Sequence, residues 1–242
     1  MDNALRLLLM FRDHRLIGVA QASEQLGVGR STAHRLLAML QARELIRQDP
    51  ATKAYTSGPA LVDIGLSIVR QMDIRQHLRP VLEQLSRTLG ETVHLMVLDE
   101  ASALFLDSVE SSKALRTSSR VGRAYPAHTT SGGKALLAEL PPARLAELYP
   151  SDRLARLTPR SITTRSRLMR ELEQVRVQGY ATNCSESEPD IAAVAVVVRN
   201  AFGEPRAAIA LSAPLLRLDT SRMPAVAKTM AGVAARASTD LA

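Results

Sequence analysis

The chain has 242 residues, which is long for one ordinary domain, so its length favours about two domains. With 46% hydrophobic and 23% charged residues, and only 12 glycines and 12 prolines, the composition excludes a disordered or fibrous protein. The longest clear apolar run, residues 191–198, is far shorter than the ~18 residues of a membrane-spanning helix, so no membrane segment is expected.

The start of the chain and its cysteine usage limit its compartment and its chemistry. Asp2 stands where a secretory signal carries basic charge, and no small-residue cleavage site follows an apolar stretch, which predicts a cytoplasmic protein. Cys184 is the single cysteine, which excludes an internal disulfide and a paired-cysteine metal or redox site. The five histidines lack metal-ligand spacing, so we expect neither a metal nor a cofactor.

Charge gives a weaker indication of the partner. The 31 basic and 24 acidic residues leave a net charge of +7, which favours a polyanionic or acidic partner. Arginine dominates the basic residues, and its planar fork suits phosphate, carboxylate or guanine edges. The alternative is that codon usage produces the arginine bias and that these side chains only solvate the surface.

Residues 1–57 predict a small helical domain that carries a hairpin. The expected helices cover residues 4–12, 19–26 and 30–42, and the second ends at Gly27. In the third helix an apolar stripe recurs at helical spacing; its members are Ala33, Leu36, Leu37 and Leu40. Two brief strands over 45–48 and 54–56 surround a turn-rich tip. This order predicts a winged helix-turn-helix.

The polar face of the third helix is the candidate DNA-reading surface. Such a helix lies in the major groove, and its N-terminal residues reach base edges and phosphates. The candidate contacts are Arg30, Ser31, Thr32, His34 and Arg35, with Lys53 at the wing tip as a phosphate contact. The alternative is an amphipathic helix whose polar face is merely solvated. Residues 1–57 have a net charge of only +3, so tight binding to double-stranded operator DNA requires a dimer or a larger assembly.

The remaining residues predict a linker helix and an α+β domain. Residues 58–73 contain an amphipathic helical stretch at 60–71, and residues 74–242 form the second domain. We expect helices over 75–89, 133–139, 142–148, 165–178 and 221–237, and strands over 93–98, 103–109, 180–184, 191–199 and 206–213. The strands form two hairpins, which indicates a mostly antiparallel sheet flanked by helices.

The segment 129–134, with the sequence TTSGGK, superficially resembles a phosphate-binding loop. That loop needs Gly where His128 stands and Ser or Thr where Ala135 stands, so the motif fails. The segment still predicts a helix start with hydroxyl groups and free backbone N–H groups, and such a start suits a carboxylate. The alternative is a plain helix cap with close packing at the glycines.

Cys184 raises an enzymatic alternative, a cysteine-dependent hydrolase whose N-terminal domain only mediates association. A catalytic cysteine needs a base and an orienting partner, and the sequence places neither His94 nor His128 beside Cys184. The neighbouring carboxylates raise the pKa of a thiol, so a small, partly buried cysteine is favoured and no enzyme is expected. A third class is a protein scaffold, which would show no salt-dependent DNA affinity.

Several motifs, in order and at matching spacing, make the chain resemble the IclR family of bacterial transcriptional regulators. They are LGVGRSTAHRLL at 26–37, YTSGPAL at 55–61, GETV at 90–93, TTSGGKALLA at 129–138 and GYA at 179–181. The resemblance covers essentially the whole length. It implies an N-terminal winged helix-turn-helix, a linker helix, and a C-terminal GAF-like domain that binds a small organic effector and thereby modulates sequence-specific DNA binding.

The resemblance also implies a homodimer or homotetramer and a set of effector contacts. Carried over by motif, these contacts are Ser131, Gly132, Asn183, Ala193 and Ser212. The chain departs from the family here: Asn183, Asp190 and Ala193 replace a common acidic residue, a glycine and a cysteine, and Val197 replaces a proline. A carboxylate, an aromatic acid, a larger or more apolar ligand, and the absence of any effector therefore all stay open.

Overall fold

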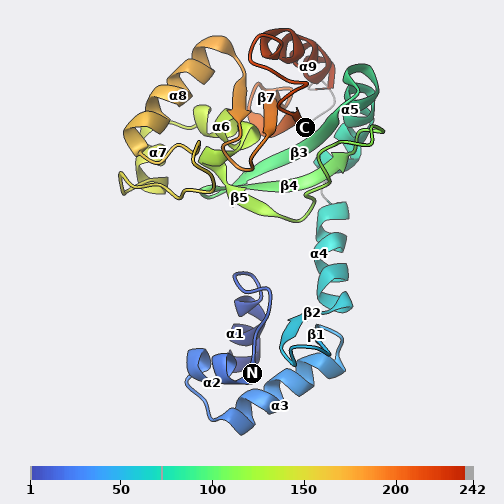
Figure 1. Cartoon of the computed structure of the whole chain (residues 1–242), viewed down its shortest axis with the longest axis vertical. Helices are drawn as coiled ribbons and strands as arrows, with labels where there is room; N and C mark the ends of the chain where they lie inside the picture. The colour runs from blue at the N-terminus through green and yellow to red at the C-terminus, as the bar shows by residue number, and fades with distance from the viewer. Residues whose placement is uncertain (1, 72, 238–242) are drawn as a thin grey trace. The chain divides into compact units, whose positions relative to one another are not determined.

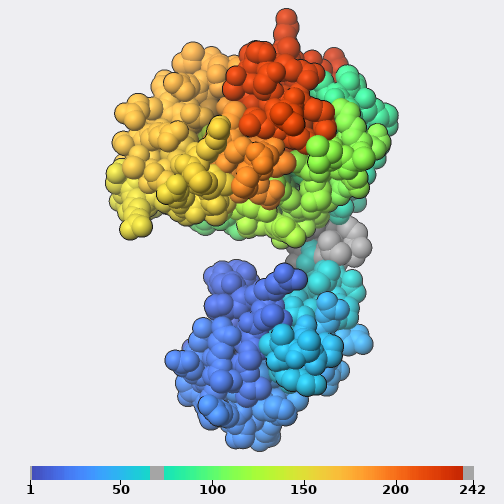
Figure 2. All heavy atoms as spheres, viewed as in Figure 1, coloured from blue at the N-terminus to red at the C-terminus, as the bar shows by residue number. Residues whose placement is uncertain are grey.

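The computed structural model describes residues 2–71 and 73–237, without the side chains of residues 66–71, 73 and 237. The chain divides into two compact units, Met1–Gln71 (unit 1) and Met72–Ala242 (unit 2). Figure 1 shows the elements of each unit, and Figure 2 shows that the atoms of each unit form a closely packed mass. Among the described residues, no helix combines the length and the apolar character needed to cross a bilayer.

Unit 1 is a helix-turn-helix followed by a two-stranded hairpin. Its elements are α1 (Asp2–Met10), α2 (Val19–Leu26), α3 (Arg30–Ala42), β1 (Ile46–Gln48), β2 (Tyr55–Ser57) and α4 (Pro59–Gln71). The predicted bounds of α2 and α3 are confirmed, and the hairpin strands each begin one residue later than expected. Helix α1 lies two residues before its predicted range, and α4 begins with Pro59, a residue suited to a first helical position.

The turn between α2 and α3 is held by local hydrogen bonds. Gly27 adopts a left-handed φ of +67°, which costs glycine little, and its N–H donates to the carbonyl of Glu24. The hydroxyl of Ser23 donates to the carbonyl of Val28 over 2.6 Å. These bonds fix the direction in which α3 leaves the turn.

The core of unit 1 holds α3 by its apolar stripe. Ala33, Leu37 and Leu40 are buried, and Leu36 is half-buried. The core also contains an unpredicted bridge, in which the backbone groups of Ile17 and Tyr55 exchange two hydrogen bonds of 2.9 Å. This bridge ties the hairpin to the segment before α2, so the wing and the helices form one body.

Unit 2 is a six-stranded sheet covered by helices. Its elements are α5 (Asp73–Leu89), β3 (Thr92–Asp99), β4 (Ser102–Val109), β5 (Ala124–Pro126), the 3₁₀ turn η1 (Ala127–Thr129), α6 (Ser131–Ala138), α7 (Pro142–Leu148), α8 (Arg165–Gln178), β6 (Ala181–Cys184), β7 (Ile191–Arg199), β8 (Pro205–Pro214) and α9 (Met223–Ala237). The strand order is β5-β4-β3-β8-β7-β6, and every described pair is antiparallel. The predicted fold class is therefore confirmed, while β5 and η1 are additions.

Successive side chains along the strands point to opposite faces of the sheet, and a different set of helices covers each face. Helices α5 and α9 pack on one face, where Val93, Ile209 and Leu211 belong to the core. Helices α6, α7 and α8 cover the other face (Figure 1), where Met96 and Ala210 lie in a second core. The polar residues of β3 and β8 that point toward α6 therefore come together inside the second layer.

Helix α6 begins earlier than predicted. It was expected over residues 133–139, but Thr130 is its N-cap and accepts a 3.0 Å hydrogen bond from the N–H of Gly133. Helix α8 has its predicted bounds: Thr164 caps its start, and Gly179 ends it with a left-handed φ of +79°. The predicted final helix begins at Met223, two residues later than expected.

Candidate functional site

Helix α3 presents a polar, exposed surface at its N-terminal end. Arg30, Ser31, Thr32, His34 and Arg35 are all exposed. Within the described part of the chain, neither Arg30 nor Arg35 forms an ion pair. The N-cap is Gly29, which has no side chain to satisfy the first backbone N–H groups. These groups and the two guanidinium groups can therefore donate hydrogen bonds outward.

The wing tip is a hydrogen-bonded turn that presents Lys53. One carboxylate oxygen of Asp49 accepts hydrogen bonds from the N–H groups of Ala51 and Thr52, over 2.9 and 2.8 Å. These bonds, with that of Thr52 the strongest cause, lower the pKa of Asp49. Lys53 is exposed at a left-handed φ of +59°. It lies on a different element from the α3 cluster, so the predicted contacts form two groups within unit 1.

Unit 2 encloses a cavity of about 20 Å³ on the sheet face that α6 covers. Its lining comes from β3, β4, β6, β7 and β8, from the segment between β4 and β5, from the start of α6 and from the loop after β6. The residues are His94, Met96, Phe105, Arg120, Thr130, Ser131, Asn183, Ser187, Ile191, Ala193, Ala210 and Ser212. Four of the five predicted effector contacts are among them. The fifth, Gly132, faces the thioether of Met96 rather than the cavity.

Polar groups of three segments meet at one wall of this cavity. The Nε2 atom of His94 lies 2.9 Å from the Oγ of Ser212, and that Oγ lies 2.7 Å from the Oγ1 of Thr117. Burial first, and then the positive charge of Arg120, lowers the pKa of His94 to about 3, so the imidazole is neutral at neutral pH. The buried Nδ1 atom of His94 has no hydrogen-bond partner among the described residues.

Asn183 organises the loop after β6. Its Nδ2 donates to the carbonyl of Thr129 over 2.6 Å, and its Oδ1 accepts from the N–H of Glu186 over 3.0 Å. Its Nδ2 also lies 3.3 Å from the Oγ of Ser187. Asn183 thus lines the cavity while its amide joins η1, the turn before α6, to the loop.

Arg120 is a cavity residue that sequence reasoning missed. Its side chain is only 9% exposed, and it forms a 2.7 Å ion pair with Glu188. The guanidinium carbon lies 5.7 Å from the ring centre of Phe105 and 5.1 Å from that of Tyr125, within the range of cation–π attraction. No local pattern marks this arginine, because its partners come from β4, β5 and the loop after β6.

Lys134, the lysine of the TTSGGK segment, forms ion pairs inside the protein. Its side chain is fully buried, and its amino group lies 2.8 Å from a carboxylate oxygen of both Glu171 and Glu186. Burial raises the pKa of Glu186, while the positive charge of Lys134 opposes that rise. This lysine is therefore engaged by the protein itself, in agreement with the failure of the phosphate-loop motif.

Cys184 has the half-buried environment that the sequence predicted. Burial first, and then the negative charge of Glu186, raises the pKa of its thiol. A raised pKa keeps the thiol protonated and weakens it as a nucleophile. No group of three or more His, Cys, Asp or Glu residues among the described residues has an arrangement that could hold a metal ion.

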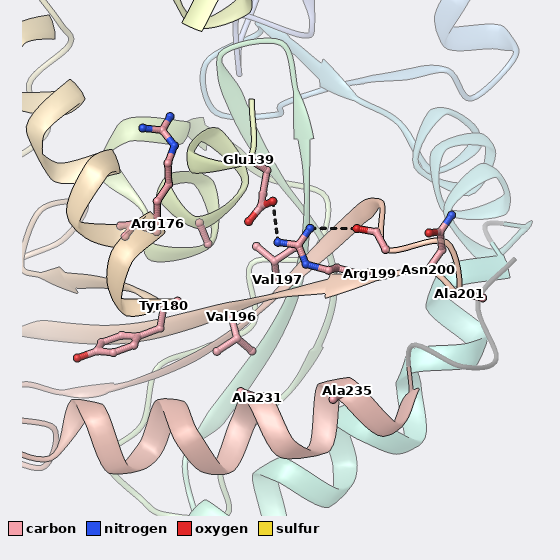
Figure 3. A pocket seen from close by; sticks show the side chains of 14 residues that line it. Glu139, Arg176, Tyr180, Val196, Val197, Arg199, Asn200, Ala201, Ala231 and Ala235 are labelled. Atoms are coloured by element: carbon pink, nitrogen blue, oxygen red, sulfur yellow. Dashed lines mark hydrogen bonds and ion pairs between the residues drawn. The ribbon is translucent and has the colours of Figure 1, made fainter. Parts of the chain in front are cut away.

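A larger hollow of about 470 Å³ lies elsewhere in unit 2, and Figure 3 shows it. Its walls come from α6, α8, β7, the β7–β8 hairpin and α9. The cations there are already engaged: Arg199 forms a 2.7 Å ion pair with Glu139, and Arg176 donates to the carbonyl of Ala138. None of the predicted effector contacts lines it, so the smaller cavity is the better candidate despite its size.

Comparisons with known proteins agree with both units. The family model described as IclR helix-turn-helix domain matches residues 1–50, and the one described as bacterial transcriptional regulator IclR C-terminal matches residues 66–239. The HTH-type transcriptional regulator XynR of Escherichia coli is 35% identical over 223 residues, which cover 92% of this chain and 88% of XynR. The regulator BhcR of Paracoccus denitrificans is 30% identical over 242 residues, covering 100% and 87% of the two chains.

A solved structure extends the match to three dimensions. The crystal structure of Thermotoga maritima IclR has a TM-score of 0.69 and 26% identity, and the match covers 98% of this chain and 96% of that chain. The two family models together span both units, and the relatives are transcriptional regulators. The chain therefore belongs to the IclR family of bacterial transcriptional regulators, with a helix-turn-helix DNA-binding domain followed by a C-terminal effector-binding domain.

Proposed function

We propose that α3 reads operator DNA through its exposed N-terminal face. Arg30 and Arg35 are suited to the bidentate contact with a guanine edge, while Ser31, Thr32 and His34 suit phosphate oxygens or bases. The observation that carries the proposal is the separation of faces on α3: its polar cluster is exposed, and Ala33, Leu37 and Leu40 are buried. Contacts at this face are made without unfolding the domain.

Lys53 adds a phosphate contact from the wing, and an oligomer supplies the rest of the affinity. The hydrogen-bonded Asp49 turn supports this role, because it holds Lys53 exposed at the tip. With a net charge of +3 over residues 1–57, one copy binds DNA weakly at physiological salt. A homodimer or homotetramer places two α3 helices on two half-sites and so reaches a useful specificity.

The second domain binds its small organic effector in the cavity beside α6. Ser131, Asn183, Ala193 and Ser212 line this space, and Gly132 acts behind it by leaving room for Met96. A volume of about 20 Å³ holds about one water molecule, so an organic effector enters only as the walls separate. Binding therefore favours an open conformation, and a difference in DNA affinity between conformations makes the effector a regulator.

The division of labour follows the predicted domains. Residues 1–57 bind DNA, residues 58–73 form a linker helix, and residues 74–242 sense the effector. Because the template is chromosomal DNA, the protein works in the cytoplasm. We assign it no catalytic step and no cofactor; the raised pKa of the Cys184 thiol argues against its use as a nucleophile.

Selection of genomic DNA tests this function directly. The full chain is mixed with sheared genomic fragments at physiological salt, and the retained fragments are sequenced. We expect enrichment of a few fragments that share an inverted repeat with half-sites about one helical turn, or a multiple of it, apart. Recovery of fragments in the proportions of the input, without a common sequence, contradicts sequence-specific regulation.

A further inference from the structure

We propose that Arg120 selects an effector that carries one negative charge, and that Glu188 is the resident counterion which the effector displaces. The inference rests on the proposed role of the cavity beside α6 as the effector site. It adds a specificity-determining residue and an exchange of carboxylates at a defined guanidinium group.

The lining of the cavity contains one ionised side chain among the described residues, that of Arg120. The other polar members are hydroxyl and amide groups, together with His94, whose lowered pKa keeps it neutral. Neutral donors, those at the start of α6 included, also accept an anion, but a full positive charge adds the stronger preference for an anion over its neutral analogue. Arg120 is therefore the main source of charge selection at this site.

The guanidinium group of Arg120 is held in place by aromatic rings. It lies beside the adjoining rings of Phe105 and Tyr125, 5.7 and 5.1 Å from their centres, and its side chain is 9% exposed. A guanidinium has five N–H donors, and its ion-pair partner among the described residues is Glu188 alone. The rings keep the cation at the cavity wall whichever carboxylate it pairs with.

The Glu188 carboxylate is suited to leave its ion pair with Arg120. It lies in the loop between β6 and β7, its side chain is 42% exposed, and a 3.3 Å hydrogen bond from the Tyr125 hydroxyl is its other contact with this site. Glu186, two residues earlier in the same loop, is by contrast 12% exposed and fixed to the buried Lys134. The loop can therefore stay anchored at Glu186 while the Glu188 carboxylate turns toward water.

Charge balance allows only one carboxylate at a time, that of Glu188 or that of the effector, to pair with Arg120. The intact Arg120–Glu188 pair is neutral, so an anion placed beside it would leave one negative charge uncompensated in a poorly solvated space. If Glu188 moves into water as the anion arrives, the cavity stays neutral throughout. The aromatic walls formed by Phe105 and His94 favour a flat organic acid over a compact inorganic anion.

Benzoate and benzamide are the probes, because they share a shape and differ in charge. Their affinities are measured by calorimetry, at constant ionic strength, for the full chain, Glu188→Gln, Arg120→Gln and the control Glu83→Gln. Glu83 is 41% exposed and pairs with Arg79, so its replacement removes an equally exposed carboxylate from an ion pair away from the cavity. Thermal unfolding verifies that each variant is folded.

Removal of the resident carboxylate should tighten benzoate binding about tenfold in Glu188→Gln, the effect of freeing one charged hydrogen-bond donor. Glu83→Gln should bind benzoate as the unmodified chain does. The unmodified chain, Glu188→Gln and Glu83→Gln should all bind benzamide with the same affinity. Arg120→Gln should lose most of the preference for benzoate over benzamide. If Arg120→Gln does not fold, the comparison of Glu188→Gln with Glu83→Gln decides alone.

The proposal is overturned if Glu188→Gln binds benzoate no more tightly than the unmodified chain, or does not bind it at all. Equal gains for benzoate and benzamide overturn it too, because charge then plays no part. The genomic selection is run on the same protein preparations. Normal DNA enrichment with unchanged benzoate affinity refutes the carboxylate exchange alone, whereas absent enrichment refutes the regulatory function.

Discussion

The Nε2 atom of His94 on β3 lies 2.9 Å from the Oγ of Ser212 on β8, so two adjacent strands are joined by their side chains at the wall of the cavity. Burial holds the pKa of His94 at about 3, far below its ordinary value of 6.5. Unfolding exposes the imidazole and restores its ordinary pKa. The stability that depends on a neutral His94 is therefore complete above about pH 6.5 and is lost as the pH falls toward about 3.

His94→Gln should reduce this acid sensitivity. Glutamine keeps an amide that can reach Ser212 but binds no proton, so the free energy of unfolding should fall less steeply between about pH 6 and pH 4. The difference in slope should approach, and not exceed, about 1.4 kcal/mol per pH unit. Urea unfolding at a series of pH values measures it. Parallel pH profiles for the two proteins would show that His94 is not buried in its neutral form.

Lys134→Met should destabilise unit 2 strongly. The substitution leaves the carboxylates of Glu171 and Glu186 without their shared cation in the interior, which costs about 3–5 kcal/mol. Lys113→Met is the matched control. The Lys113 side chain is 45% exposed and its partner Glu91 keeps a second cation, Arg217, so the loss should stay below about 1 kcal/mol. Similar urea midpoints for the two variants would contradict the buried network.

Gly133→Ala should destabilise unit 2 more than Gly132→Ala does. A Cβ at Gly133 would press on the backbone of Ala127 and on the Thr130 hydroxyl that caps α6, and neither can move easily. A Cβ at Gly132 would meet the flexible side chain of Met96 instead. We expect a loss of about 1–3 kcal/mol for Gly133→Ala and less than about 1 kcal/mol for Gly132→Ala. Thermal unfolding of the two variants measures both losses. A larger loss for Gly132→Ala than for Gly133→Ala would contradict this packing.

The elements that sequence reasoning located best are those with strong local signals. The apolar spacing predicts the bounds of α3, and Gly27 and Gly179 end α2 and α8 in the left-handed conformations that glycine favours. The short strand β5 escaped prediction because its three residues are exposed or half-buried and carry no alternation. Helix α6 begins two residues before its predicted start, because Thr130 caps it and Ser131 and Gly132 already belong to its first turn.

The candidate sites also contain residues that the sequence predicts and residues that it does not. The exposure of the α3 cluster follows from helical periodicity, so Arg30 and Arg35 were accessible to sequence reasoning. The resemblance to the family supplied Ser131, Asn183 and Ser212, which the fold brings to one cavity. Arg120 and Glu188 escaped because their contact joins two irregular segments far apart in the chain, and no spacing rule connects such segments.

DNA titration of Arg35→Ala against Arg43→Ala tests the central claim most directly. Both arginines are exposed; Arg35 lies on the proposed DNA-reading face, whereas Arg43 is the C-cap of α3. Binding to a fragment from the genomic selection is followed by fluorescence anisotropy at several salt concentrations. We predict that Arg35→Ala loses about 1–3 kcal/mol of binding free energy and that Arg43→Ala keeps nearly full affinity. Equal affinities of the two variants at every salt concentration would contradict DNA reading by this face of α3.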